Sequence, residues 1–182
     1  MTFGPRAKLL ALIALFLAPI GASLYAYYVV RPGPNANYGE LIPPRPAHLG
    51  ALRFVTPPPA GAAALAEHWV LVAADAAACE AACVEKLTTM RQVRLALGRN
   101  ASRVARLLVV DGGPPDAALL ADGLVAGRPE AALPADDAML RDRGHIYLVD
   151  PRGDVMLRWP AVPDRKRMLK DLERLLRASQ IG

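Results

Sequence analysis

The sequence predicts an α/β domain, with a mixed β-sheet flanked by helices, preceded by one N-terminal transmembrane helix. A long uncharged segment stands near the N-terminus, and short apolar segments of strand length recur through the rest of the chain. Two amphipathic segments, one before the second strand and one at the C-terminus, have helical spacing. A length of 182 residues fits one such domain with an added membrane anchor.

The N-terminal apolar segment, Leu9–Val30, contains no charged residue. A helix of this length, at about 1.5 Å per residue, can cross a hydrocarbon core of roughly 30 Å. Arg6 and Lys8 precede it and no acidic residue does, so residues 1–8 are expected in the cytoplasm, 9–30 in the membrane and the rest outside. A cleaved signal peptide is the alternative, with Gly21-Ala22-Ser23 as its small-residue site. We therefore expect a protein of the bacterial inner membrane whose soluble domain lies on the periplasmic side.

Proline dominates the next segment, 31–60, which holds eight of the chain's 17 prolines. Because proline fixes φ and lacks an N–H donor, neither a helix nor a central strand is expected there. The segment is predicted to be a semi-rigid spacer between the membrane and a domain that covers 61–182.

Apolar patterning and turn signals within 61–182 predict four strands and four helical segments. The strands are Trp69–Ala74, Arg103–Val110, His145–Val149 and Asp154–Trp159, and the helical segments are Cys83–Leu97, Asp116–Leu124, Pro134–Arg141 and a C-terminal helix capped by Asp164.

The order of these elements predicts the topology of the sheet. A strand, a helix and a second strand joined by short connections imply two parallel strands and a right-handed crossover. The short turn Asp150–Gly153 joins the last two strands in an antiparallel hairpin. This order is that of the thioredoxin-like architecture, with the two cysteines between its first strand and first long helix.

The two cysteines, Cys79 and Cys83, have three residues between them. On the first turn of a helix, residues four apart share one face, and Cα atoms roughly 6 Å apart can form a disulfide. A helix N-terminus also favours the thiolate, the form that exchanges disulfides and binds Cu(I) or zinc. We expect a reversible disulfide; two small apolar residues of a helix are the alternative interpretation.

The net charge of +5 does not indicate nucleic-acid binding, because the chain has no basic block with interleaved aromatics and only 5% aromatic residues. Arg165-Lys166-Arg167 fits a solvated helix face or attraction to anionic lipid headgroups.

From Trp69 to Leu176 the chain resembles the Sco/SenC family, the membrane-anchored thioredoxin-like copper chaperones of cytochrome c oxidase assembly. The resemblance rests on Cys79 and Cys83, on Val109-Val110-Asp111, and on the segment Tyr147–Gly153. It implies copper as a cofactor, and a respiratory oxidase subunit or assembly factor as the partner. It also implies a metal site made of the two cysteines and one histidine.

The chain departs from that pattern at the histidine. The matching position holds Asp142, whose hard oxygen suits Cu(I) poorly. His145 lies three residues further on, and strand parity predicts that 142 and 145 face opposite sides. We assign Cys79 and Cys83 as catalytic residues and as metal ligands, with His145 as a third candidate ligand; Met139 is a softer alternative. Three functions remain open: oxidase assembly by thiol–disulfide chemistry or copper delivery, a non-catalytic scaffold of the oxidase, and a general thiol oxidoreductase.

Overall fold

The computed structural model describes residues 4–30, 37–55, 65–129 and 138–179. The chain forms two compact units, 1–36 and 37–182. In the first unit, helix α1 (Pro5–Tyr25) continues into a π-helical turn, Ala26–Val30. Within the segment Pro5–Tyr28, a stretch of 18 residues has a mean hydropathy of 2.2 and no buried side chains, so by length and composition the segment is a candidate membrane span. A signal sequence would have the same properties.

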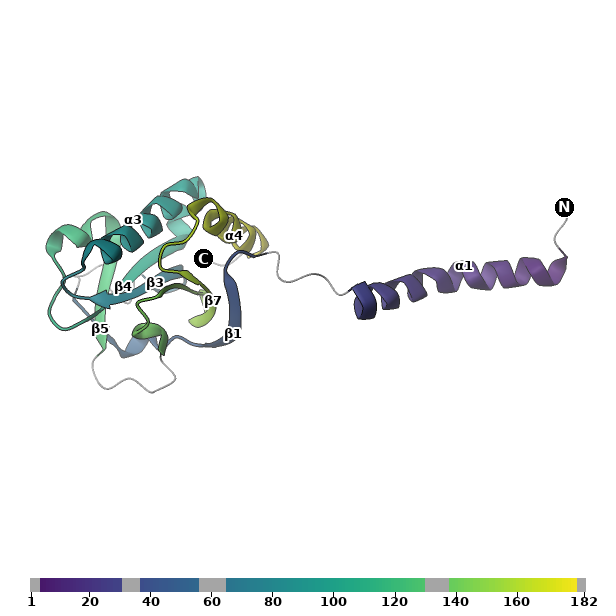
Figure 1. Ribbon diagram of the computed structural model, residues 1–182, viewed down its shortest axis with the longest axis horizontal. Coiled ribbons are helices and arrows are strands. Elements are labelled where there is room, and N and C mark those ends of the chain that lie inside the picture. Colours follow the sequence, from purple (N-terminus) through teal and green to yellow (C-terminus); the bar gives the residue numbers. More distant parts are fainter. Residues whose placement is uncertain (1–3, 31–36, 56–64, 130–137, 180–182) are drawn as a thin grey trace. The chain divides into compact units, whose positions relative to one another are not determined.

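The second unit is built on one seven-stranded sheet with the strand order β1-β7-β6-β3-β4-β5-β2 (Figure 1). Strands β3, β4 and β5 are parallel to one another, and all other neighbours are antiparallel. The strands are β1 (Glu40–Pro46), β2 (Leu52–Phe54), β3 (Trp69–Ala76), β4 (Val104–Asp111), β5 (Leu124–Pro129), β6 (His145–Val149) and β7 (Asp154–Pro160). The unit also contains helices α3 (Ala81–Ala96) and α4 (Arg165–Ala178). Short 3-10 helices lie at Leu49–Ala51, Gly98–Arg103, Ala117–Gly123 and Ala138–Leu140.

Each face of the sheet carries its own hydrophobic cluster. Helices α3 and α4 both cover one face (Figure 1), where Leu71, Leu108 and Ile146 pack against them. The other face packs Val72, Val109 and Tyr147, among others, against loop residues. Because strand residues alternate between faces, Ile146 and Tyr147 mark opposite sides of β6.

The predicted thioredoxin-like core agrees with the structure at β3, α3, β4, β6, β7 and α4. Asp164 caps α4 as predicted, since its carboxylate accepts hydrogen bonds from the N–H groups of Lys166 and Arg167.

The prediction of a spacer over 31–60 was wrong for residues 40–54. Strands β1 and β2 lie in this segment and form the two edges of the sheet, paired with β7 and β5. Edge strands tolerate proline because one side of the strand needs no hydrogen-bond donors. The pairing of β1 with β7 also shifts register between Leu41 and Arg45, across Pro43 and Pro44. The domain therefore begins at Asn37 rather than at residue 61.

Strand β5 is a second difference from the prediction, which placed no strand after the helical segment ending at Leu124. That segment is a 3-10 helix, Ala117–Gly123, and β5 follows it directly. Within the predicted helical segment Pro134–Arg141, residues 138–140 form a 3-10 turn, and 134–137 lie outside the described residues.

Candidate functional site

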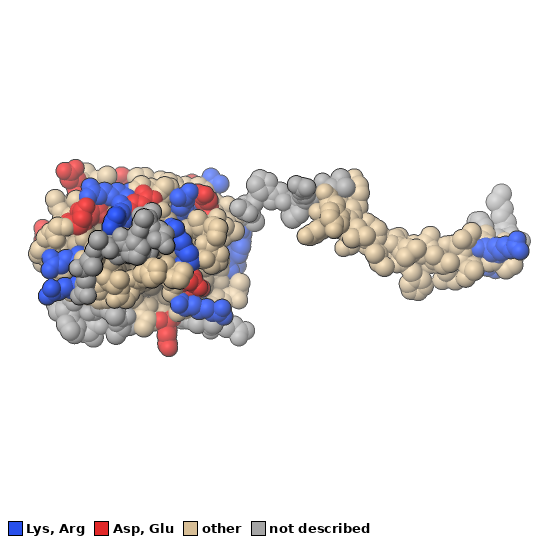
Figure 2. Space-filling model, turned by 90° about the horizontal axis from the view of Figure 1, so that it is seen from below, with Lys and Arg blue, Asp and Glu red and all other residues tan. Residues whose placement is uncertain are grey.

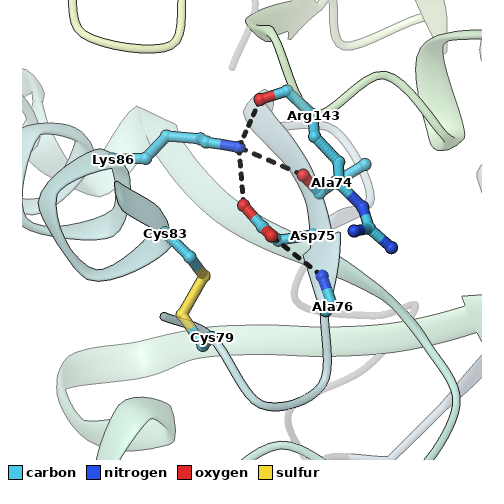
Figure 3. Close-up of a disulfide and its surroundings, with 7 residues drawn as sticks. All are labelled: Ala74, Asp75, Ala76, Cys79, Cys83, Lys86 and Arg143. Atoms are coloured by element: carbon cyan, nitrogen blue, oxygen red, sulfur yellow. Dashed lines mark hydrogen bonds and ion pairs between the residues drawn. A yellow bond between two sulfur atoms is a disulfide. The ribbon is translucent and has the colours of Figure 1, made fainter. Parts of the chain in front are cut away.

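The two cysteines form a disulfide between the end of β3 and the start of α3 (Figure 3). Their Cα atoms lie 5.1 Å apart. After β3 the chain turns tightly, with the Cys79 N–H donating to the Ala76 carbonyl at 3.0 Å. Cys79 has φ 41°, in the left-handed region that a side chain rarely adopts. The turn and the cross-link together hold Cys79 in this conformation.

The first turn of α3 favours a thiolate at Cys83. Glu80 is the N-cap residue but its side chain makes no capping hydrogen bond, and no acidic side chain lies in the first turn. The N–H groups of that turn therefore have no side-chain acceptor and stabilise negative charge beside them. Such a setting makes a thiol a better leaving group in disulfide exchange.

The two sulfur-bearing residues differ in exposure. Cys79 is 6% exposed and Cys83 is 2% exposed, and both belong to the hydrophobic cluster under α3 and α4. Both cysteines are therefore buried, and Cys79 is the more exposed of the two.

A buried lysine lies beside the disulfide and was not predicted from the sequence. Lys86, 2% exposed, donates from Nζ to the Asp75 carboxylate at 2.9 Å, to the Ala74 carbonyl at 3.1 Å and to the Arg143 carbonyl at 2.8 Å (Figure 3). These three acceptors satisfy all three ammonium donors. Lys86 thus ties the cysteine-bearing helix to the end of β3 and to the loop before β6. Lys86 lies three residues after Cys83, which places it on the apolar side of α3, and this spacing was the signal in the sequence that could have predicted its burial.

An open cavity of about 410 Å³ adjoins the end of β3, at the carboxyl ends of the parallel strands. Its walls include Asp75, Asp111 and Arg143, and Arg143 forms an ion pair with Asp111. Charged groups of both signs therefore border this cavity. On the face seen in Figure 2, Lys and Arg side chains are likewise interspersed with Asp and Glu.

The structure does not bring His145 to the cysteines. Its Nδ1 lies 2.6 Å from Asp142 Oδ2, and the Tyr147 hydroxyl donates to the same oxygen at 2.6 Å. His145 precedes Tyr147 by two residues, so both lie on the face of β6 opposite the disulfide. Met139 is also buried in the cluster of that other face.

The expectation that Asp142 and His145 face opposite sides was wrong. Strand β6 begins only at His145, and residues 142–144 form a turn in which the Gly144 N–H donates to Asp142 Oδ1 at 2.8 Å. Strand parity does not apply across a turn, so the two side chains meet. Burial raises the pKa of Asp142, but hydrogen bonds from Tyr147, Gly144 and His145 outweigh it and hold this pKa below its usual value. Burial, followed by the bond to Asp142, raises the pKa of Tyr147.

The side chains do not assemble a complete copper site in this state. Within the described ranges, no three His, Cys, Asp or Glu side chains lie close enough together to hold a metal ion. The sulfurs are joined to each other, and the imidazole of His145 is engaged by the Asp142 carboxylate on the other face. A resident metal held by Cys79, Cys83 and His145 together does not fit this arrangement.

A sheet flanked by helices, with a cysteine pair at the start of its first long helix, defines a thioredoxin-like protein. Residues 69–179 match the family of transmembrane-like, thioredoxin-like C-terminal domains, and the chain belongs to this family. No curated protein matches the sequence.

Solved structures of similar fold include Sco proteins. The apo Sco1 protein of Thermus thermophilus is 16% identical, with a TM-score of 0.57 over 79% of this chain and 99% of that one. Copper-bound yeast Sco1 is 13% identical, with a TM-score of 0.50 over 63% and 82%. BsSco, described as a member of the Sco family of cytochrome c oxidase assembly proteins with a disulfide switch, is 14% identical, with a TM-score of 0.50 over 76% and 95%. The predicted Sco/SenC resemblance is thus confirmed as a likeness of fold.

Proposed function

We propose that this protein is a membrane-anchored thiol–disulfide exchange protein that supports cytochrome c oxidase assembly. The Cys79–Cys83 disulfide at the start of α3 carries this proposal. The partner is a reduced dithiol on an oxidase subunit or assembly factor, by analogy with the described role of BsSco.

In the exchange, a partner thiolate attacks Cys79 Sγ, the bond to Cys83 Sγ breaks, and Cys83 leaves as a thiolate. The second thiolate of the partner then attacks the partner sulfur that is bonded to Cys79, which forms the partner's disulfide and releases the Cys79 thiolate. The partner dithiol loses two electrons and becomes a disulfide, and the Cys79–Cys83 disulfide gains these two electrons and becomes a dithiol. The difference in exposure between the two cysteines sets the order of attack.

Trapping with glutathione tests the exchange. In the oxidised, detergent-solubilised full chain, mass-tag labelling should find no free thiol before mild reduction, two after it and none after reoxidation. Cys83→Ala should accumulate a stable mixed disulfide with glutathione at Cys79. Cys79→Ala is the matched control and should accumulate much less, because Cys83 is buried. Thiols that stay inert throughout would instead support the non-catalytic scaffold.

Copper delivery is the second candidate, favoured by the copper-bound yeast Sco1 of similar fold. Here copper is cargo, and after reduction Cys79 and Cys83 supply two soft thiolates. Competition between the reduced protein and a Cu(I) chelator distinguishes the candidates. Stoichiometric binding that is lost in Cys79→Ala supports delivery, and reversible thiols without copper binding support exchange alone, including a general thiol oxidoreductase.

We also propose that the N-terminus is cytoplasmic and the domain periplasmic, because Arg6 and Lys8 precede the candidate span. A reporter that is active only outside the cytoplasm, fused after Gly182, should be active. A folded but inactive fusion would reverse this orientation.

A further inference from the structure

The outer surface of α4 is a ridge of positive charge. Lys166, Lys170 and Arg177 are all exposed, and they follow one another at spacings that share a helix face. Glu173, the acidic side chain among them, is only partly exposed, and Asp171 is buried with 3% exposure. We call Lys166, Lys170 and Arg177, with Arg165 at the start of the helix, the α4 ridge.

The surface beside the α4 ridge is apolar rather than acidic. A groove of about 220 Å³ runs between α3 and α4, lined by Gln92, Val93, Ala96, Arg165, Lys166 and Leu169. Leu95, on the outer side of α3, is 56% exposed. Basic side chains flanking an apolar strip are the combination that a lipid headgroup interface accommodates.

The chain enters the domain on this same helix. The carboxylate of Asp171 accepts hydrogen bonds from the N–H groups of Tyr38 at 3.1 Å and Gly39 at 2.8 Å. The indole of Trp159 donates to it at 3.1 Å, which leaves the buried carboxylate well satisfied.

The entering residues are also fixed from the flank of α4. Arg167 stacks over the Tyr38 ring at 4.2 Å, and Arg174 donates to Asn37 at 2.8 Å. An added Cβ at Gly39 would meet Trp159 Nε1 at 2.6 Å, so this close approach requires glycine. Residues 37–39 are therefore fixed on α4, so the chain enters the domain at this helix.

The sequence between the candidate span and the domain is short. The span ends at Tyr28 and the domain begins at Asn37, which leaves residues 29–36. Because an extended residue covers at most about 3.6 Å, this segment can carry Asn37 no further than roughly 30 Å from the membrane. Because Arg174 contacts Asn37, the same limit of chain length applies to this part of α4.

We propose that the α4 ridge binds anionic lipid headgroups and orients the domain on the membrane that anchors it. The partner is the lipid surface, attracted by the exposed Lys and Arg side chains. This orientation does not depend on the chemistry of the disulfide, which lies at the opposite end of α3 from Ala96.

Energy transfer in nanodiscs tests the proposal with the full chain. A donor dye is attached at Ala178→Cys, an exposed position at the end of α4, and the acceptor is a headgroup-labelled lipid. Transfer should be greater in discs containing phosphatidylglycerol than in phosphatidylcholine discs, and high salt should abolish the difference. Lys166→Glu with Lys170→Glu should lower the equilibrium constant for docking of α4 on the lipid surface by at least about 25-fold, since each basic residue near an anionic surface contributes roughly a factor of five.

Arg45→Glu with Arg53→Glu is the matched control, because it makes the same change in net charge at exposed residues of β1 and β2, outside α3 and α4. This control should retain the lipid-dependent transfer. Equal transfer in the two lipids, or an equal loss in the control, would overturn the proposal. Glutathione trapping at Cys79, measured on the Cys83→Ala forms of the same variants without the dye, separates this outcome from a failure of the proposed function.

Discussion

The two faces of the sheet hold two different kinds of reactive group. On the face under α3 and α4, the Cys79–Cys83 disulfide lies in apolar packing, and Lys86 is neutralised by Asp75. On the other face, Asp142 joins His145 and Tyr147 in a partly exposed polar cluster. The alternation of side chains along β6 separates them, because Ile146 and Leu148 face the disulfide side while Tyr147 faces away. Soft sulfur donors and the imidazole therefore cannot be treated as one site.

The largest effect is expected on the disulfide face, from Lys86→Met. This change keeps most of the side-chain volume but leaves the Asp75 carboxylate without its cation and two carbonyls without a donor. Removing one partner of a buried ion pair is strongly destabilising, so the free energy of unfolding should fall by about 3 kcal/mol. Denaturation followed by the fluorescence of the buried Trp69 and Trp159 measures it.

Lys170→Met is the control for Lys86→Met, because Lys170 is exposed. Its effect on unfolding should stay within about 0.5 kcal/mol. If the two variants lose equal stability, then Lys86 does not hold the disulfide face together.

A smaller effect is expected from opening the disulfide itself. The cross-link closes a loop of only a few residues, for which loop entropy gives a stabilisation of about 2 kcal/mol. Reduction should lower the unfolding free energy of the native chain by this amount. The variant with both Cys79→Ala and Cys83→Ala should not respond to the reductant, and a response there would mean that the reductant acts elsewhere.

The sequence predicts the central part of this fold well because those elements follow simple patterns. The apolar runs of β3 and β4 and the spacing of Met168, Leu172 and Leu176 in α4 are local signals of burial. The edge strands gave no such signal. Pro43 and Pro44 argue against a strand in general, and only the position at a sheet edge, a non-local fact, makes them acceptable.

The site divides in the same way. The spacing of Cys79 and Cys83 was sufficient to predict that a disulfide could form. The contact of Asp142 with His145 depends on where β6 begins. Because successive strand residues face opposite sides, an error of one residue in the start of the strand reverses the side predicted for a side chain. The three acceptors of Lys86 come from β3 and from the loop at Arg143, so no local pattern identifies them.

On the other face, Tyr147→Phe should cost about 1 kcal/mol of stability at neutral pH, because it removes one hydrogen bond to the Asp142 carboxylate. The lowered pKa of Asp142 means that its contribution is present above the ordinary value of 3.8 and is lost as pH falls through the lower folded value. The raised pKa of Tyr147 means that its contribution is present below 10.0 and is lost as pH rises through the higher folded value.

The stability difference between the native chain and Tyr147→Phe should therefore shrink at both extremes of pH, as measured by denaturation across the range. Asp142→Asn should remove the acid limb of this dependence. A difference that stays constant with pH would mean that the hydroxyl contributes only through packing.

The smallest effect is expected from His145→Ala on Cu(I) binding by the reduced protein. His145 is held by Asp142 on the face away from the sulfurs, so its loss should change the Cu(I) affinity by less than about twofold, or roughly 0.4 kcal/mol. Cys83→Ala removes one of two thiolates and should weaken any binding far more, which makes it the positive control. Competition with a calibrated Cu(I) chelator measures both. A tenfold loss in His145→Ala would show that the turn at residues 142–144 rearranges when the disulfide opens, so that the separation of the two faces holds only for the oxidised protein.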